Sequence, residues 1–272
     1  MSTGQPAFFE DKSKKLFIIL GGFFIANALV AEFIGVKIFS VEQTLGIEPF
    51  HISLFGMENL SFNMTAGVIQ WPFVFVMTDI INEYYGQKGV RFLSSIAAGL
   101  IAYSFLMVNM AIFLHPADFW PQSHIDPSLP IAEQEAIRQQ VGNFNSAFKM
   151  VYNQSSWIIL GSITAFLFGQ LVDVVVFHRI KKITGEKAIW LRSTGSTLIS
   201  QFFDSFIVLF IAFYIGAGWS IQRVLALGLV AYVYKFVVAV LMTPVIYLVH
   251  FGIEKYLGEE LATEMKDMSA AD

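Results

Sequence analysis

The sequence predicts an all-α polytopic membrane protein, and its low charge and long apolar runs are the observations behind that prediction. Charged residues make up 14% of the 272 residues, against about 25% in soluble domains. A soluble fold with so little charge would expose large apolar patches. Residues of the types AVILMFWYC make up 56% of the chain, and they gather in six runs near the roughly 20 residues that a spanning helix needs. We therefore predict one integral membrane domain over residues 1–272, a bundle of six transmembrane helices at about 16–37, 64–86, 90–114, 151–178, 195–217 and 221–250.

The first predicted helix also resembles a signal peptide, because basic residues precede it and it contains the A-x-A pattern Ala26-Asn27-Ala28. The apolar run continues past that pattern and is long enough to span, so we expect the helix to be retained. Short turns at 87–89 and 218–220 join neighbouring helices. The segment 179–194 is expected to be a basic loop.

The distribution of Lys and Arg predicts the orientation in the membrane. With both ends of the chain in the cytoplasm, twelve of the 17 basic residues lie inside, four lie outside, and Lys235 falls within the last helix. We therefore expect N- and C-termini in the cytoplasm, an even number of helices, and a multi-pass protein in contact with the lipid bilayer.

Two long segments, 38–63 and 115–150, then face the outside. Within the second, Ile137, Val141, Phe144 and Phe148 recur at helical spacing among polar residues. This pattern predicts an outer amphipathic segment at about 131–149. It would lie in the interface, cover the outer mouth of a cavity, or serve only as a packing loop.

The composition excludes several function classes. The chain has 21 acidic and 17 basic residues and no Cys, so we expect no nucleic-acid partner and no thiol, iron–sulfur or Cys-zinc chemistry. The His residues have no metal-ligand spacing, and neither a P-loop nor a G-x-S-x-G motif occurs. We predict no enzyme activity, no catalytic residues, no metal and no cofactor.

Polar and ionisable residues inside the apolar runs are the candidates for function, because a charge at the bilayer centre costs at least about 2.5–3.5 kcal/mol. Two Gln-x-x-Asp pairs recur 31 residues apart on successive antiparallel helices, and each pair lies on one helical face. Asp79 and Glu83 are also on one face. The candidates are Asn27, Asp79, Asn82, Glu83, Gln170, Asp173, Gln201, Asp204 and Lys235.

Such groups converging in an apolar bundle predict a solute-binding or proton-carrying site. Carboxylate acceptors and amide donors near aromatic side chains such as Trp71 and Phe75 suit a planar, donor-rich heterocycle. More ordinary interpretations remain open. Asp79 and Glu83 would pair with Lys88 or Arg91 at a helix end, and Lys235 would only neutralise a buried Asp. The Gln-x-x-Asp pairs and Asn27 would then only pack the bundle.

The stretch from Pro72 to Gly86, with its Thr-Asp-x-x-Asn-Glu-x-x-Gly pattern, resembles the signature of the queuosine precursor transporter family, also called the vitamin uptake transporter family. The stretches Gln170–Asp173 and Gly195–Ser205, and Lys235 ahead of Thr243-Pro244, agree with it. The resemblance covers about 64–250. It implies a six-helix protein of the cell inner (plasma) membrane, with a fold similar to the substrate-binding subunits of energy-coupling factor transporters. It also implies uptake of 7-cyano-7-deazaguanine or 7-aminomethyl-7-deazaguanine.

We expect Asp204 and Gln201 to bind the edge of the base, with Gln170 and Asp173 opposite and Asn27 and Lys235 completing the site. Asp79, Asn82 and Glu83 are expected to form a cytoplasmic gate or a proton path. Proton coupling and facilitated diffusion are both open, a homo-oligomer is possible, and the sequence requires no separate energising ATPase. The alternatives are a transporter of another vitamin or nucleobase-like solute and a structural membrane protein.

Overall fold

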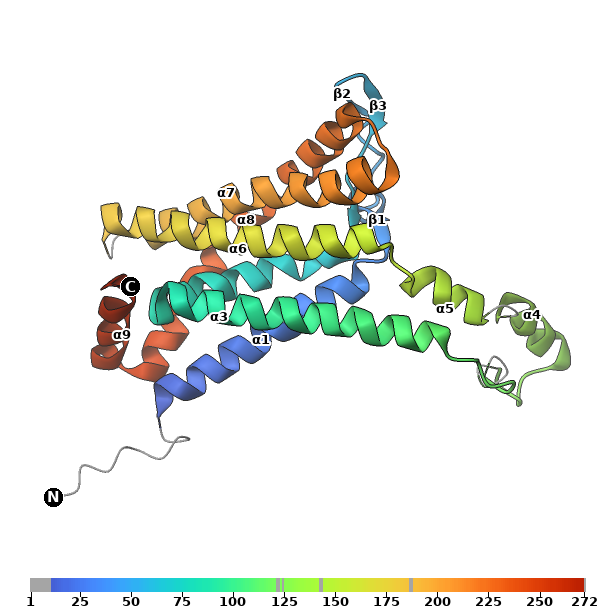
Figure 1. The fold of residues 1–272 in the computed structure, drawn as a ribbon, viewed down its shortest axis with the longest axis horizontal. Coiled ribbons are helices and arrows are strands. Elements are labelled where there is room, and N and C mark those ends of the chain that lie inside the picture. The colour runs from blue at the N-terminus through green and yellow to red at the C-terminus, as the bar shows by residue number, and fades with distance from the viewer. Residues whose placement is uncertain (1–10, 121–122, 124, 142–143, 186–187, 272) are drawn as a thin grey trace.

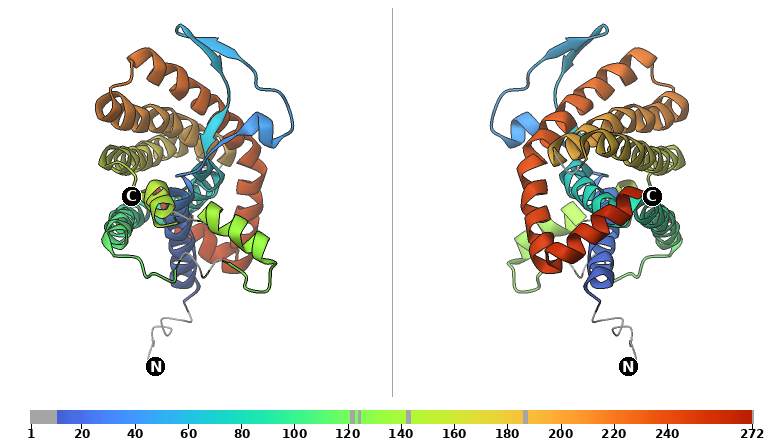
Figure 2. Two further views of the ribbon diagram at one scale, coloured as in Figure 1. Left: turned by 90° about the vertical axis from the view of Figure 1, so that its right-hand side faces the viewer. Right: turned by 90° about the vertical axis from the view of Figure 1, so that its left-hand side faces the viewer.

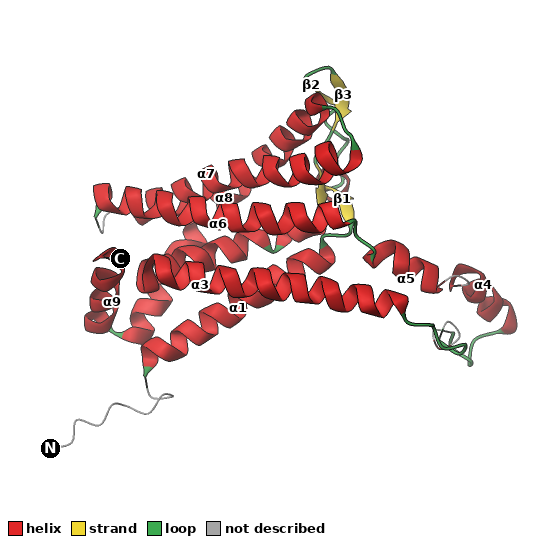
Figure 3. Cartoon of the chain, in the orientation of Figure 1, coloured by secondary structure: helices red, strands yellow, loops and turns green. Residues whose placement is uncertain are grey.

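The computed structural model describes residues 11–271 apart from 121–122, 124, 142–143 and 186–187. Helices dominate the described part of the chain (Figure 3), and five of them are long and apolar enough to cross a membrane. This confirms an all-α membrane protein. The five are α1 (Lys12–Ile34), α3 (Trp71–Phe113), α6 (Ser156–Thr184), α7 (Ile189–Leu209) with its π-helical continuation η3 (Phe210–Ile215), and α8 (Ile221–Leu257).

Helix α3 joins the two predicted helices 64–86 and 90–114 into one element that breaks at Gly86. The backbone of Gly86 has φ 67° and ψ −172°, a region that only glycine adopts readily. Figure 1 shows the chain reversing direction at this break, so that α3 consists of a first arm, residues 71–85, and a second arm, residues 87–113. The first arm begins later than predicted because residues 63–69 form a short strand and a 3₁₀ turn.

The predicted basic loop 179–194 is mostly helical. Helix α6 continues to Thr184 and α7 begins at Ile189, so residues counted as loop, among them Arg192, belong to the bundle. The last spanning helix, α8, extends beyond the predicted end at 250. It is followed by α9 (Glu259–Ala271), which the sequence analysis did not predict.

The predicted outer segment 38–63 is not an unstructured loop. It contains α2 (Val41–Thr44) and two antiparallel pairs, in which β1 (Ile38–Ser40) pairs with β4 (Asn63–Thr65) and β2 (Ile52–Leu54) pairs with β3 (Met57–Leu60). The 3₁₀ turn η1 (Ala66–Ile69) leads from β4 to α3. A small apolar cluster that includes Leu60, Met64 and Val230 packs this segment against the first half of α8. Figure 2 shows the strands lying beside the helices at this end of the bundle.

The predicted amphipathic segment 131–149 corresponds to α4 (Ile131–Val141) and α5 (Phe144–Tyr152), and residues 142–143 lie outside the described residues. Figure 1 shows both helices extending away from the end of the bundle. Their placement in an interface stays a prediction.

The bundle has two distinct ends. At one end lie the start of α1, the reversal within α3, the end of α6, the start of α7, the end of α8, and α9 (Figure 1). Lys12 Nζ donates to the carbonyl of Tyr256 at 2.9 Å, so α1 begins where α8 ends. We call this end the basic end, because the described basic residues predicted to face the cytoplasm lie in these segments. The opposite end, which carries β1–β4, is the hairpin end.

Candidate pocket and buried ion pairs

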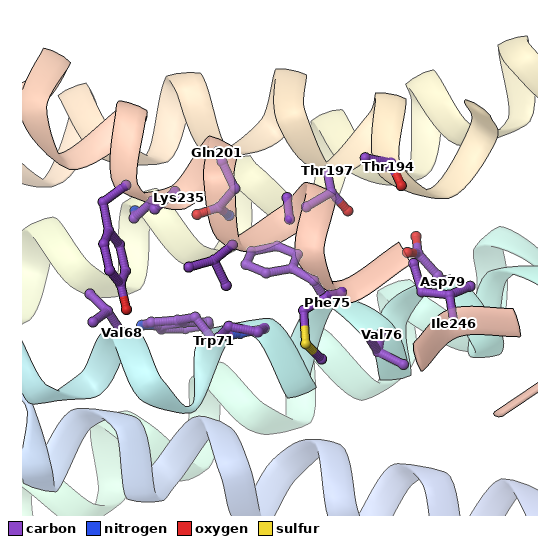
Figure 4. Close-up of a pocket in the computed structure, with 15 residues that line it drawn as sticks. Val68, Trp71, Phe75, Val76, Asp79, Thr194, Thr197, Gln201, Lys235 and Ile246 are labelled. Atoms are coloured by element: carbon purple, nitrogen blue, oxygen red, sulfur yellow. The ribbon is translucent and has the colours of Figure 1, made fainter. Parts of the chain in front are cut away.

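A pocket of about 490 Å³, its open mouth included, lies between the first arm of α3, α7 and α8 (Figure 4). It follows the first arm from Val68, next to the hairpin end, to Asp79 in the middle of that arm. Trp71 and Asp79 are eight residues apart, which is about 12 Å of helix. The pocket is lined by Val68, Trp71, Pro72, Phe75, Val76, Asp79, Thr194, Thr197, Gln201, Tyr234, Lys235, Val238, Ala239, Met242 and Ile246.

Polar groups stand at both ends of this pocket, with aromatic rings between them. Figure 4 shows Gln201 and Lys235 toward one end, Asp79 and Thr194 toward the other, and the rings of Trp71 and Phe75 along the floor. The two ring centroids are 6.1 Å apart. An apolar pocket with a few fixed polar groups is the usual form of a small-molecule site.

Asp79 is the carboxylate that reaches this pocket. Its side chain is only 1% exposed, and neither carboxylate oxygen has a hydrogen-bond partner among the described residues. The side-chain amide nitrogen of Gln201, also buried, has none either. Because a buried polar group without a partner costs about 1–3 kcal/mol and more when charged, both groups are suited to bonding with a bound polar molecule.

Asp204 does not line the pocket, and it forms an ion pair with Lys235, which does. Both side chains are largely buried, so the lysine neutralises the carboxylate. This is one of the more ordinary interpretations offered for Lys235. The charge of Lys235 is balanced even though its side chain faces the pocket.

Gln170 and Asp173 lie on α6 beside α7, outside the pocket lining. The hydroxyl of Thr78 donates to Gln170 Oε1 at 3.1 Å, and the hydroxyl of Ser200 donates to Asp173 Oδ1 at 3.3 Å. A Cβ built at Gly169 would lie 3.9 Å from the Cβ of Asp204, so the two Gln-x-x-Asp segments do pack against each other. Their contacts join α3, α6 and α7.

The side chain of Asn27 makes a hydrogen bond within its own helix, α1. Its side-chain amide donates to the carbonyl of Phe23 at 2.8 Å, and it is not among the residues that line the pocket. A role for Asn27 in binding remains a prediction.

Glu83, one turn after Asp79, belongs to a fully buried ion-pair cluster. Arg192 binds it in a bidentate manner, from Nε to Oε2 at 3.0 Å and from the terminal nitrogen to Oε1 at 2.8 Å. Lys181 Nζ lies 3.4 Å from Oε1. Arg192 was not among the predicted site residues, because the segment 179–194 was expected to be a loop. An acidic pair deep in an apolar run, which needs a cation from elsewhere, was the available signal.

Helix α9 closes the basic end over this cluster. The hydroxyl of Ser269 donates to the backbone carbonyl of Glu83 and accepts from Lys181 Nζ at 3.2 Å. Ala262 and Met265 of α9 belong to the main apolar core. Glu83 and its partners thus hold α3, α6, α7 and α9 together at this end, which is compatible with the predicted gate.

Among the described residues, no group of three or more His, Asp or Glu side chains is placed to hold a metal ion.

Comparison with known proteins finds a family whose members span the same region. The family model described as "Putative vitamin uptake transporter" matches residues 65–249, which is about two thirds of the chain. The chain belongs to this family. The match to the vitamin uptake transporter family runs from the end of β4 into α8 and includes every residue that lines the pocket. Helix α9 lies outside it.

Three curated proteins are similar to the chain. A "Probable queuosine precursor transporter" of Bacillus subtilis (strain 168) is 28% identical over 203 residues, covering 72% of this chain and 73% of that protein. One with the same name from Haemophilus influenzae is 25% identical over 240 residues, 86% of each chain. A "Queuosine precursor transporter" of Escherichia coli (strain K12) is 26% identical over 199 residues, covering 71% and 74%. The resemblance to this family is confirmed.

No solved structure matches the chain significantly. The expected likeness to the substrate-binding subunits of energy-coupling factor transporters therefore stays a prediction.

Proposed function

We propose that this chain is a membrane transporter that imports a queuosine precursor, a 7-deazaguanine, and binds it in the pocket beside the first arm of α3. The names of the three similar proteins support the substrate class. The observation that carries the proposal is the unpartnered carboxylate of Asp79 at the end of an aromatic pocket.

The chemistry of a 7-deazaguanine fits these groups. Its ring N–H and exocyclic amine are neighbouring donors, and one carboxylate can accept from both. The amide nitrogen of Gln201 stands toward the other end of the pocket, where it would donate to an acceptor on the opposite side of the ring system. The flat ring system packs on aromatic faces such as those of Trp71 and Phe75. Cyano and aminomethyl precursors share this guanine edge, so both fit the same contacts.

We propose that Asp79, rather than Asp204, binds the donor edge of the base, because Asp204 already forms an ion pair with Lys235. In this assignment Gln201 remains a substrate contact. Gln170 and Asp173 support the pocket from α6, and the pair of Lys235 with Asp204 borders it. Glu83 with Arg192 forms the seal at the basic end.

We further propose that the two arms of α3 are separate membrane spans, so that the protein has six spans. Both termini then face the cytoplasm, and the protein lies in the inner membrane. The concentration of Lys and Arg at the basic end supports this orientation. Nothing in the pocket requires a separate ATPase.

The proposal is tested by binding of 7-cyano-7-deazaguanine to the detergent-purified protein. Asp79→Asn should weaken binding about 10- to 100-fold, since hydrogen bonds to a charged group contribute about 1.5–3 kcal/mol. Asp118→Asn, an exposed loop residue far from the pocket in sequence, is the matched control and should bind as the wild type does. Absence of saturable binding by the folded wild type would refute the proposed substrate.

A competitor series tests the contact itself. 7-Deazaguanine and 7-deazahypoxanthine differ only in the exocyclic amine, so the wild type should prefer the first. Asp79→Asn should lose most of that preference. An unchanged preference in the variant would show that the donor edge of the base does not bind Asp79.

A further inference from the structure

The polar groups behind the pocket form a cluster that the proposed substrate does not satisfy. Asp79 on α3 lies against α6 close to Asp173, because the preceding residue, Thr78, donates to Gln170 Oε1 at 3.1 Å and Gln170 is three residues before Asp173. Asp173 and Ser193 of α7 are among the groups that act on the Asp79 carboxylate. Ser193 is fully buried and its hydroxyl has no hydrogen-bond partner in the described part of the chain. Asp173 Oδ2 and both polar side-chain atoms of Asn82 are equally buried, and they too have no partner among the residues that the structure describes.

Asn82 follows Asp79 by three residues on the same helical arm, so the two side chains share one face. Buried polar groups in folded proteins nearly always have a partner, and a group of several without one indicates a site for an ion or water. The atoms here are carboxylate, amide and hydroxyl oxygens, together with one amide nitrogen. Hard cations prefer such oxygen ligands.

The charge balance of the same region indicates the charge of that ion. The region contains three carboxylates, because those of Asp173 and Glu83 both act on the carboxylate of Asp79. Two cations, Arg192 and Lys181, pair with Glu83. One negative charge is left over. The side chains of all five residues are at most 4% exposed, so water cannot screen that charge.

We infer that one singly charged cation, Na⁺ or a proton, binds between Asp79 and Asp173 and couples its own movement to that of the substrate. This inference rests on the proposed function for its coupling step, because Asp79 belongs to the pocket and to the cation site at once. Occupation by the cation changes the charge of the group that accepts from the base. A coupling ion bound next to the substrate is a common arrangement in secondary transporters.

The charged and titratable groups around the site come from every neighbouring helix. Glu83 stands on α3, Lys181 on α6 and Arg192 on α7. His250 on α8 interacts with Lys181 and Arg192, and also with Glu254 on α8 and Lys266 on α9. A response to pH therefore counts as proton binding at this site only where substitution of the two aspartates removes it.

The first experiment uses the cation alone, without substrate. Thermal unfolding of the purified protein is measured with NaCl against choline chloride at equal ionic strength and fixed pH, and then from pH 8 to pH 6 without Na⁺. A bound cation should raise the unfolding temperature by about 5–10 °C at 100 times its Kd. Asp79→Asn and Asp173→Asn should abolish the rise, and Asp118→Asn should retain it.

The salt series and the pH series distinguish Na⁺ from a proton as the bound cation. A rise with NaCl identifies Na⁺, and a rise only at lower pH identifies the proton. A wild type indifferent to both, or variants that keep the full response, would overturn the inference. Should Asp173→Asn not fold, Ser193→Ala removes one oxygen at smaller structural cost, and it should weaken the response to the cation severalfold.

The second experiment measures uptake of 7-cyano-7-deazaguanine into proteoliposomes. An imposed inward gradient of the identified cation should increase accumulation by the wild type, whereas Asp173→Asn should take up equal amounts with and without the gradient. Binding without any cation response refutes only the coupling inference. A cation response without binding of the base refutes only the proposed substrate.

Discussion

Replacing Arg192 by Gln removes the bidentate partner of Glu83, a carboxylate with no access to solvent. Breaking a buried ion pair from one side costs about 3–5 kcal/mol, because the remaining charge stays buried without compensation. Lys181 remains 3.4 Å from Glu83 Oε1 and keeps part of the charge balanced. We therefore expect a loss near 3 kcal/mol in the free energy of unfolding, and a smaller loss for Lys181→Gln.

The assay is denaturant unfolding of the purified protein in detergent, with Lys182→Gln as the control. Lys182 is the exposed neighbour of Lys181, and its replacement should change stability by less than about 0.5 kcal/mol. The double variant of Glu83→Gln with Arg192→Gln should be more stable than the sum of the two single losses predicts, since it leaves no bare carboxylate. Strict additivity, or a loss for Arg192→Gln no larger than the control, would refute this account.

Three further predictions concern the edges of the bundle. Gly86→Ala should cost about 1–3 kcal/mol in unfolding free energy, because φ 67° with ψ −172° suits glycine alone, whereas Gly22→Ala on an open helix face should be neutral or stabilising. Burial acts to raise the pKa of Glu42, but the hydrogen bonds from a backbone N–H and the Ser40 hydroxyl outweigh it, and the pKa is lowered. The contribution of this carboxylate is therefore present above about pH 4.3 and is lost as pH falls through its folded value. The protection factors for hydrogen exchange over 38–65, which correct for the intrinsic pH dependence of the exchange rate, should therefore fall below that pH in the wild type. The same pH dependence in Glu42→Gln would contradict the assignment. Ser269→Ala should cost about 1–3 kcal/mol and expose α9 to protease, and unchanged digestion would exclude the closing role of α9.

The spanning helices were predictable because bilayer thickness leaves few ways to place an apolar run of this length. What the sequence did not reveal is which polar groups meet. Asp79 and Glu83 are four residues apart and share a helical face, yet one faces the pocket and the other pairs with Arg192, 109 positions later. Partner choice across that distance depends on how α6 and α7 turn at the basic end, which hydropathy does not encode.

The outer strands and α9 carried weaker signals. Phe55 and Gly56 join β2 to β3, and both have positive φ, as a tight hairpin turn requires. Phe at a position with positive φ is uncommon, so the turn was not recognised. Helix α9 is rich in Glu, Ala and Met, which favour helices, but its low hydropathy placed it outside the search for membrane spans.

The reversal at Gly86 makes the membrane insertion of the two arms of α3 a single event. The first arm has 15 residues, about 22 Å of helix, which is shorter than the roughly 30 Å hydrocarbon core. It also carries Asp79, Asn82 and Glu83, and a single Asp at a helix centre costs about 2.5–3.5 kcal/mol on the translocon scale. The 27-residue second arm is apolar and long enough to enter unaided. With the two arms as separate spans, as proposed above, we expect both to enter the bilayer together as one helical hairpin. Synthesis would then proceed past Phe113 before Asp79 leaves water.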